Sequence, residues 1–189
     1  MLIYSMNVSV DGFTADRDGA FAWTLPSEEV FRFHTDQVRE LGVFLMGRRL
    51  YETMLVWDTD PSLSADAAGA AFADVWCALP KVVFSRTLDS VQGNARLATA
   101  SLADEVAAAR AATPMDVGIG GPGLAVGAME RGLIDELRMV RHPIVVGGGT
   151  SFLPPVTTDV PLELMETRAF ASGVVFERYR VMREGTDGV

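Results

Sequence analysis

Residues Met115 to Gly149 read MDVGIGGPGLAVGAMERGLIDELRMVRHPIVVGGG. This stretch predicts a short strand over 116–119, a turn at Gly120-Gly121, a helix over 122–131 and a second strand over 134–141. Glycine lets a backbone approach a ligand closely, proline suits the first helical turn, and a helix N-terminus offers unpaired N–H groups to an anion. The stretch therefore predicts a phosphate-binding turn, and the alternative is a glycine-rich turn without a ligand.

The same turn matches the pattern G-x-G-x-x-G at Gly118, Gly120 and Gly123. In a Rossmann domain that pattern belongs to the first βαβ unit and is followed by an acidic residue about 20 positions later. Here the pattern lies in the last third of the chain, and the nearest acids, Asp135 and Glu136, come too early. A Rossmann dehydrogenase is therefore rejected.

The composition describes one compact domain. A chain of 189 residues with 49% hydrophobic and 22% charged residues is long enough to bury a large core. The single cysteine, Cys77, excludes an internal disulfide. No apolar run is long enough to span a membrane and no signal peptide is visible, so a cytoplasmic protein is expected. The net charge of −9 argues against nucleic acid as a partner.

Strand and helix patterns alternate along the rest of the chain, which predicts a single α/β domain. Segment 13–26 predicts a long loop and a candidate lid, 58–65 predicts another loop, and 91–97 is irregular or weakly extended. A closing hairpin is predicted over 162–170 and 174–182, within a domain over 1–184 that leaves 185–189 as a frayed tail. The remaining strands are predicted over 2–10, 43–46 and 82–85, and the remaining helices over 27–41, 47–56, 66–78 and 101–112, with N-caps at Ser27 and Ser101.

Three short motifs follow predicted strands directly. They are Gly47-Arg48-Arg49, Ser85-Arg86-Thr87 and Gly120 to Gly123. Ligands of open α/β sheets bind outside the carboxyl ends of the strands, so the three motifs are expected to line one edge. Glycine backbone, hydroxyl groups and arginines suit a ligand with several phosphates. For any one of these arginines alone, the alternative is a solvated surface group.

The order S-x-D-G, W-x-L-P, G-R-x-x-Y-E, S-R-T, G-G-x-G and a closing hairpin resembles the dihydrofolate reductase superfamily over nearly the whole chain. Within it, the chain is similar to the reductase domain of bifunctional riboflavin-biosynthesis deaminase-reductases. The resemblance implies a three-layer fold with a mostly parallel sheet, NADPH as hydride donor, and a homodimer. It also implies pyrophosphate binding by Gly47, Arg48, Arg49, Gly120, Gly121, Pro122 and Gly123, and binding of the adenosine 2′-phosphate by Ser85 and Arg86.

Two signals leave the substrate open between a pterin-like ring and a pyrimidine of the 5-amino-6-ribosylaminouracil type. The segments 23–28 (WTLPSE) and 47–52 (GRRLYE) resemble folate reductases. The segment 9–12 (SVDG), with 60–63 (DPSL), resembles the riboflavin-pathway reductases. No deaminase zinc motif is present. A small heterocyclic substrate is therefore expected.

Hydride transfer to a C=N or C=O group leaves an atom that needs a proton, which a carboxylic acid or a bound water can supply. Glu28 is the first candidate and Asp11 the second. Their alternative roles are a partner of the helix dipole and a strand-end turn residue. Trp23 and Tyr51 are candidates to stack on the substrate ring, with core packing as the alternative.

His34 and His142 share no spacing that predicts a metal site and are interpreted as structural. The leading hypothesis is an NADPH-dependent reductase. The alternative is a non-catalytic dinucleotide-binding homodimer that keeps the fold.

Overall fold

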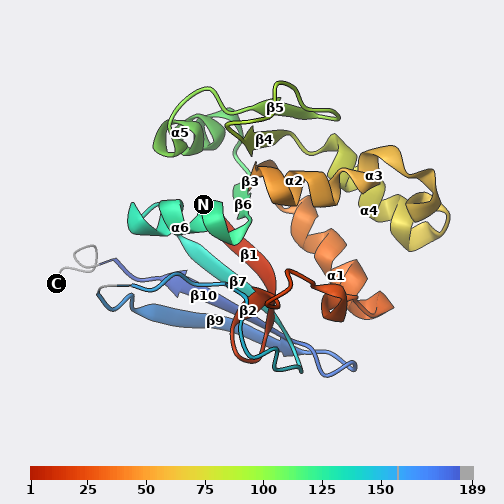
Figure 1. Cartoon of the computed structure of the whole chain (residues 1–189), viewed down its shortest axis with the longest axis vertical. Coiled ribbons are helices and arrows are strands. Elements are labelled where there is room, and N and C mark those ends of the chain that lie inside the picture. Colours follow the sequence, from red (N-terminus) through yellow and green to blue (C-terminus); the bar gives the residue numbers. More distant parts are fainter. Residues whose placement is uncertain (157, 184–189) are drawn as a thin grey trace.

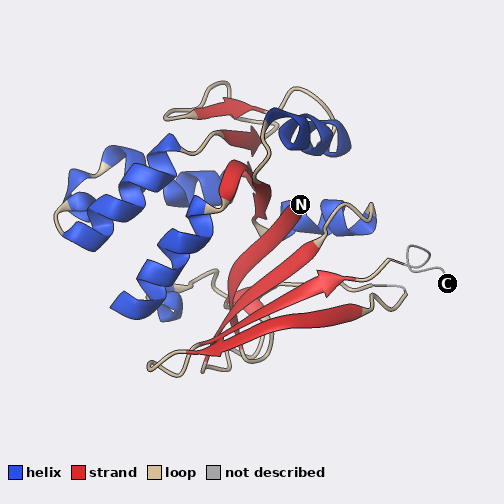
Figure 2. Ribbon diagram, turned by 180° about the vertical axis from the view of Figure 1, so that it is seen from behind, coloured by secondary structure: helices blue, strands red, loops and turns tan. Residues whose placement is uncertain are grey.

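The computed structural model describes residues 1–156 and 158–183. Its centre is an eight-stranded sheet in the order β5-β4-β3-β6-β1-β7-β10-β9 (Figures 1 and 2). The first six strands in this order are parallel neighbours, and β10 and β9 close the sheet as an antiparallel hairpin. The strands are β1 Leu2–Ser9, β3 Leu41–Gly47, β4 Lys81–Phe84, β5 Ala95–Leu97, β6 Asp116–Gly120, β7 Glu136–His142, β9 Leu162–Ala169 and β10 Val175–Val181.

Helices cover both faces of the sheet, which gives three layers. Figure 1 shows α5 and α6 on one side and α1, α2 and α4 on the other. The helices are α1 Glu28–Arg39, α2 Arg48–Met54, α3 Val56–Thr59, α4 Ala67–Ala78, α5 Leu102–Ala112 and α6 Pro122–Glu130, with the 3-10 turns η1 Ala22–Thr24 and η2 Pro61–Ser64. The predicted mixed α/β fold with a closing hairpin is confirmed.

Successive side chains of the central strands point to opposite faces of the sheet and fill the two interfaces with the helices. Leu45 faces α5 and α6 in one apolar cluster, whereas its neighbour Met46 packs with Phe72 and Trp76 of α4 on the opposite face. A third cluster joins α1 to β7 and β10. Because both faces are covered, the central strands read as continuous apolar runs in the sequence.

Several element boundaries differ from those predicted. The helix predicted over 27–41 ends at Arg39, because Leu41 already pairs with Asp116 as the first residue of β3. The long loop predicted over 13–26 contains the strand β2, Phe13–Ala15, which pairs with β8, Thr150–Ser151. The loop predicted over 58–65 contains the end of α3 and η2. The tail predicted over 185–189 and the domain end at 184 lie outside the described residues.

No helix within residues 1–156 and 158–183 is long and apolar enough to cross a membrane. Over the same residues, no group of three or more His, Cys, Asp or Glu side chains is placed to hold a metal ion.

Candidate functional site at the carboxyl edge of the sheet

Five neighbouring parallel strands, β4, β3, β6, β1 and β7, end at the same edge of the sheet. We call this the carboxyl edge and divide it by charge. The basic half consists of segments 47–49, 85–87 and 120–123, which follow β3, β4 and β6 and contain three arginines and no acid. The acidic half consists of segments 10–29 and 143–149, which follow β1 and β7. The three predicted phosphate motifs thus share one edge.

Contacts join the three loops of the basic half. Arg48 Nη1 donates to Thr87 Oγ1 at 2.7 Å and so ties the loop after β3 to the loop after β4. Its Nε donates to Glu52 Oε1, also at 2.7 Å. Gly121 has a φ of +87°, and a Cβ there would lie 3.9 Å from the backbone nitrogen of Gly47. The loop after β6 therefore passes close to the loop after β3, in a conformation that favours glycine.

Two arginines of the basic half are free. Among the residues that the structure describes, Arg49 and Arg86 are the arginines whose guanidinium groups make no hydrogen bond or ion pair with another residue. Both side chains are exposed. Ser85 is partly engaged, because its Oγ accepts from the amides of Thr87 and Leu88. Unpaired cations beside glycine turns are what a phosphate ligand requires.

The helices that begin in the basic half lack side-chain caps. Ser27, Asp66 and Ser101 cap α1, α4 and α5 by accepting a hydrogen bond from a first-turn amide. In contrast, α2 and α6 begin after Gly47 and Gly121, neither of which has a capping side chain. Pro122 has no N–H group, and the Leu124 N–H already donates to the Gly121 carbonyl at 3.1 Å. The donors left for an anion are therefore the Gly123 N–H of α6 and the first-turn N–H groups of α2.

In the acidic half, the carboxylate of Asp11 holds two loops together. It accepts hydrogen bonds from the amides of Val146 at 3.2 Å and Gly147 at 2.7 Å. A hydrogen bond from the side chain of Ser9 and these two amides hold the pKa of Asp11 below its usual range. A carboxyl group with a lowered pKa is ionised at neutral pH and therefore rarely carries a proton to donate. These contacts fit the strand-end role better than the catalytic one, which stays a prediction.

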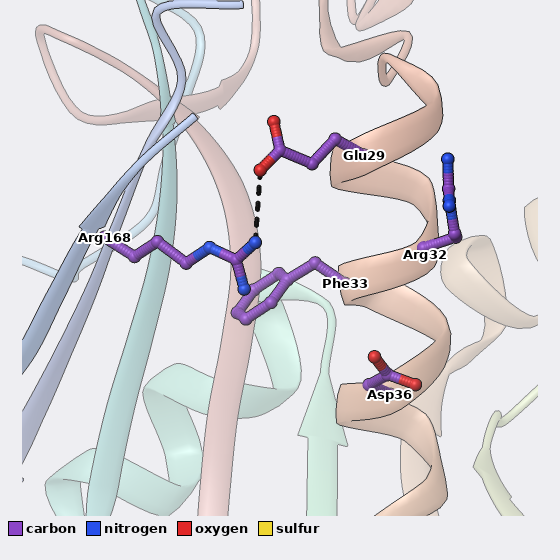
Figure 3. Close-up of a pocket in the computed structure, with 5 residues that line it drawn as sticks. All are labelled: Glu29, Arg32, Phe33, Asp36 and Arg168. Atoms are coloured by element: carbon purple, nitrogen blue, oxygen red, sulfur yellow. Dashed lines mark hydrogen bonds and ion pairs between the residues drawn. The ribbon is translucent and has the colours of Figure 1, made fainter. Parts of the chain in front are cut away.

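Glu28 and Glu29 open α1 and differ in what they contact. Glu28 is 74% exposed and pairs with Arg32 at 2.7 Å. Glu29 pairs with Arg168 of β9 at 3.1 Å, as Figure 3 shows, and the Arg168 guanidinium also lies over the Phe33 ring. A hollow of about 240 Å³ lies beside this pair, lined by Glu29, Arg32, Phe33, Asp36 and Arg168. Glu28 therefore remains accessible, in an exposed ion pair.

The two candidate stacking residues lie in different environments. Trp23 lies in η1, with its ring 5.8 Å from that of His142 in an edge arrangement, and its Nε1 is buried without a hydrogen-bond partner in the described chain. Tyr51 is only 5% exposed and packs in the core beside α4, and its hydroxyl accepts from the Gln92 amide at 2.6 Å. This packing gives Tyr51 a structural role, and its stacking on a substrate stays a prediction.

A polar cluster that sequence reasoning did not connect lies beneath α1. His142 Nε2 and Asn7 Oδ1 are 2.9 Å apart, and burial lowers the pKa of His142. Burial, and then the nearby His142, lower the pKa of His34 to about 4, and His34 Nε2 has no partner among the described residues. The only signal in the sequence is that Asn7 and His142 lie near the ends of two predicted strands. Their pairing requires knowledge of the register of β1 on β7.

Comparison with known proteins shows the family of this chain. Residues 1–176 match the RibD C-terminal domain family, and the chain belongs to that family. The uncharacterized protein YyaP of Bacillus subtilis (strain 168) is 26% identical over 178 residues, which cover 92% of this chain and 91% of YyaP.

Two solved structures share the fold. A protein from Shewanella sp. PV-4, described as a riboflavin biosynthesis protein, superposes with a TM-score of 0.74 at 21% identity, covering 96% of this chain and 99% of that one. Dihydrofolate reductase from Enterococcus faecalis, solved with NADP(H), superposes with a TM-score of 0.62 at 16% identity, covering 96% of each chain. The predicted similarity to the reductase domain of riboflavin-biosynthesis deaminase-reductases is confirmed by the family, and the predicted dihydrofolate-reductase-like fold by the superposition. Family and fold together support an oxidoreductase of the riboflavin-pathway reductase type.

Proposed function

We propose that this chain is an NADPH-dependent reductase of a small heterocyclic substrate, either a pterin-like ring or an aminopyrimidine. The observation that carries the proposal is the pair of unpaired arginines, Arg49 and Arg86, beside two uncapped helix N-termini on one edge. A cation without a partner in the protein can bind a phosphate without first breaking an ion pair, so the ligand keeps the net gain of the charge-assisted hydrogen bond. The Enterococcus faecalis reductase, which shares the fold, was solved with NADP(H).

The basic half offers groups for two parts of a dinucleotide, the pyrophosphate and the adenosine 2′-phosphate. Arg48, Arg49 and the first turn of α2 would hold the pyrophosphate together with Gly120 to Gly123 at the start of α6. Arg86, with the Ser85 hydroxyl, would hold the adenosine 2′-phosphate. Gly47 and Gly123 leave open space where a Cβ would otherwise lie, which lets a ligand approach the backbone. NADPH bound there would supply a hydride to a C=N or C=O group of the substrate.

Glu28, directly or through a water, is the proposed proton source at the acidic half. Its carboxylate is exposed and lies at the start of α1, so it can exchange protons with solvent between turnovers. Asp11 is the second candidate, weakened by the two amides that it already accepts from. Trp23 is the proposed ring-stacking residue, because η1 places it beside the carboxyl ends of β1 and β7.

The test of cofactor binding is a titration with NADPH and, separately, with NADH, followed by quenching of tryptophan fluorescence. NADPH is expected to bind more tightly, and Arg86→Ala to reduce its affinity roughly 10- to 100-fold, because at least one charge-assisted hydrogen bond is lost. NADH affinity should hardly change in this variant. Arg39→Ala is the matched control, because Arg39 pairs with Asp36 away from the carboxyl edge. Absence of binding by either dinucleotide would rule out the reductase.

The test of the proton source is Glu28→Gln, assayed by NADPH oxidation with a panel of heterocycles. The variant should lose about 100-fold or more in kcat/KM while its NADPH affinity is unchanged, since general acid catalysis typically contributes 10²–10⁴-fold. Glu29→Gln is the matched neighbour, and it should keep its activity because Glu29 faces Arg168. Equal activity of the Glu28 variant and the unmodified protein would assign the proton to water or to Asp11.

A second candidate is a non-catalytic dinucleotide-binding homodimer. It is favoured by the engagement of both candidate acids, Glu28 with Arg32 and Asp11 with two amides. It is also favoured by β9, an edge strand whose residues are exposed along its whole length and whose outer backbone is free to pair with a second copy. Light scattering gives the oligomeric state, and NADPH binding without oxidation across the panel would support this candidate.

A further inference from the structure

The central strand β1 extends beyond its neighbour on one side. On that side the pairing with β6 runs from Leu2 to Tyr4, and β6 ends at Gly120. On the other side β7 accompanies β1 as far as Ser9. The second half of β1 therefore has no strand beside it on the side of the basic half, where the glycine turn 120–123 begins.

The middle of β1 is also more accessible than its two ends. Ser5, Met6 and Asn7 are half-buried, whereas the residues of β1 before and after them are buried. Asn7 pairs in register with Val140, which packs in the cluster between α1 and the sheet, and strand side chains alternate between faces. Ser5 and Asn7 therefore lie on the α1 face of a central strand, within reach of solvent.

The side-chain amide of Asn7 is held in one orientation by His142. Asn7 Oδ1 lies 2.9 Å from His142 Nε2, and an amide oxygen can only accept, so the buried imidazole donates this hydrogen bond. The Asn7 Nδ2 group is then directed away from His142, and among residues 1–156 and 158–183 it makes no hydrogen bond. Because an amide NH₂ group can only donate, Asn7 presents a free hydrogen-bond donor on this face.

The other groups around His142 also lack partners. The ring of Trp23, the proposed ring-stacking residue, lies 5.8 Å from the His142 ring. Trp23 Nε1 and His34 Nε2 are buried without a partner in the described chain, whereas buried polar groups in folded proteins are nearly always hydrogen-bonded. Asn7 thus lies beside the proposed ring-stacking residue and faces α1, the helix that carries Glu28.

From these observations, and resting on the proposed function, we propose that Asn7 is a specificity residue that donates a hydrogen bond from Nδ2 to a carbonyl oxygen of the substrate ring. His142 is the positioning residue that holds the amide in this orientation. A ring carbonyl can only accept, whereas an amino group in its place would set two donors against each other. The site therefore selects a ring with oxo groups over a ring of the same shape with amino groups.

The test uses two ribosylaminopyrimidines that differ only in carrying two oxo groups or two amino groups on the ring. Calorimetry measures the binding of each compound, first without NADPH and then at saturating NADPH. The unmodified protein should favour the oxo ring, and Asn7→Asp should shift the ratio of the two affinities about 10-fold or more towards the amino ring, because a carboxylate accepts from amino groups. An unchanged ratio in this variant would overturn the proposal, and so would failure of both compounds to bind at about 1 mM.

Two variants of His142 test how the amide is oriented. His142→Phe removes the donor that holds Asn7 Oδ1 and should abolish the preference between the rings, whereas His142→Gln keeps a donor and should retain most of it. Asn94→Asp is the matched control, because Asn94 binds the Ala78 carbonyl before β5, at the amino ends of the strands. A full preference in His142→Phe would overturn the positioning role, and a shifted ratio in the control would overturn the assignment to Asn7.

The measurements without NADPH separate this proposal from the proposed function. If the dinucleotide does not bind, the reductase proposal fails, while the ratio of the two ring affinities still tests Asn7. The affinity for NADPH should be the same in Asn7→Asp and in the unmodified protein. A loss of NADPH affinity as large as the shift in the ratio would assign the Asn7 amide to the nicotinamide and overturn its role towards the substrate.

Discussion

The basic and acidic halves of the carboxyl edge use their polar side chains differently. In the basic half, two guanidinium groups have no partner in the described chain, and two helices begin without a side-chain cap. In the acidic half, Asp11 bonds two backbone amides, Glu28 and Glu29 each bond an arginine, and Arg17 bonds a carbonyl group. Two charged groups are thus left free in the basic half, whereas these four charged groups of the acidic half are bonded within the protein.

This difference means that ligand affinity and folding stability depend on different groups of the carboxyl edge. Free groups contribute little to folding and are available to a ligand, whereas satisfied groups hold loops in place and are costly to redirect. The basic half is therefore prepared for an anion before the ligand arrives. In the acidic half, bonded side chains hold the loops in place beside the proposed heterocyclic ring of the substrate, which makes few charged contacts.

The largest effect is expected from the double variant Arg49→Ala and Arg86→Ala. NADPH affinity should fall roughly 100-fold or more, because two charge-assisted hydrogen bonds of about 1.5–3 kcal/mol each are removed. Thermal unfolding should be unchanged, since neither guanidinium contacts another described residue. Fluorescence titration and differential scanning calorimetry measure the two quantities. A loss of stability as large as the loss of affinity would show that the two arginines have partners in the folded protein.

The next effect is a loss of folding stability as the pH falls. The pKa of His34 in the folded protein is about 4, below its ordinary value of 6.5, so the unfolded chain binds the proton more readily. The stability from neutral His34 is complete above pH 6.5, and roughly 3 kcal/mol should be lost as the pH falls to 4. Urea denaturation across this range measures the loss, and His34→Gln should remove it. A flat profile from pH 7 to 5 would contradict the buried neutral state.

A buried carboxylate of α5, Glu105, titrates in a different range. The Arg96 guanidinium and the amides of Thr99 and Ala100 lower the pKa of Glu105 to about 2. Its contribution to stability is present above pH 4.5 and is lost between 4.5 and about 2. Acid should therefore loosen the region of His34 before it reaches α5.

The sequence predicted most of this fold because its signals are local. Ser27 and Ser101 cap helices as their positions indicated, and the hairpin over 162–182 follows from alternation. The pair β2 and β8 was missed because strands of three and two residues have no measurable period. The edge was predictable because the carboxyl ends of parallel strands meet. Which arginine is free was not, because Arg48 binds Thr87 across 39 residues.

In the acidic half, too, contacts between residues far apart in the sequence could not be predicted. Asp11 reaches Val146 and Gly147 across 135 and 136 positions, and no local pattern encodes that contact. His34 and His142 were interpreted as structural from the sequence, but their neighbourhood with Asn7 depends on strand register. Sequence patterns therefore locate the edge, while the division of its groups into free and satisfied requires tertiary contacts.

A smaller effect is expected from releasing the loop that Asp11 holds. Asp11→Ala should speed hydrogen exchange at the amides of Val146 and Gly147. It should also reduce turnover about 10-fold, because the loop 143–149 is no longer held in position. Asp11→Asn keeps one acceptor oxygen and should retain part of both. If the two variants exchange alike but both abolish turnover, the carboxyl group acts as an acid and not as a loop anchor.

The smallest effect compares the two exposed ion pairs at the start of α1. Arg32→Ala removes a pair that is exposed on both sides, and the free energy of unfolding should change by less than about 0.5 kcal/mol. Arg168→Ala should cost about 1 kcal/mol, because Arg168 also lies 5.5 Å from the Phe33 ring centre and 4.7 Å from that of Phe170. Urea denaturation of both variants measures the difference. Equal costs would mean that the contacts of Arg168 with the two aromatic rings add nothing to stability.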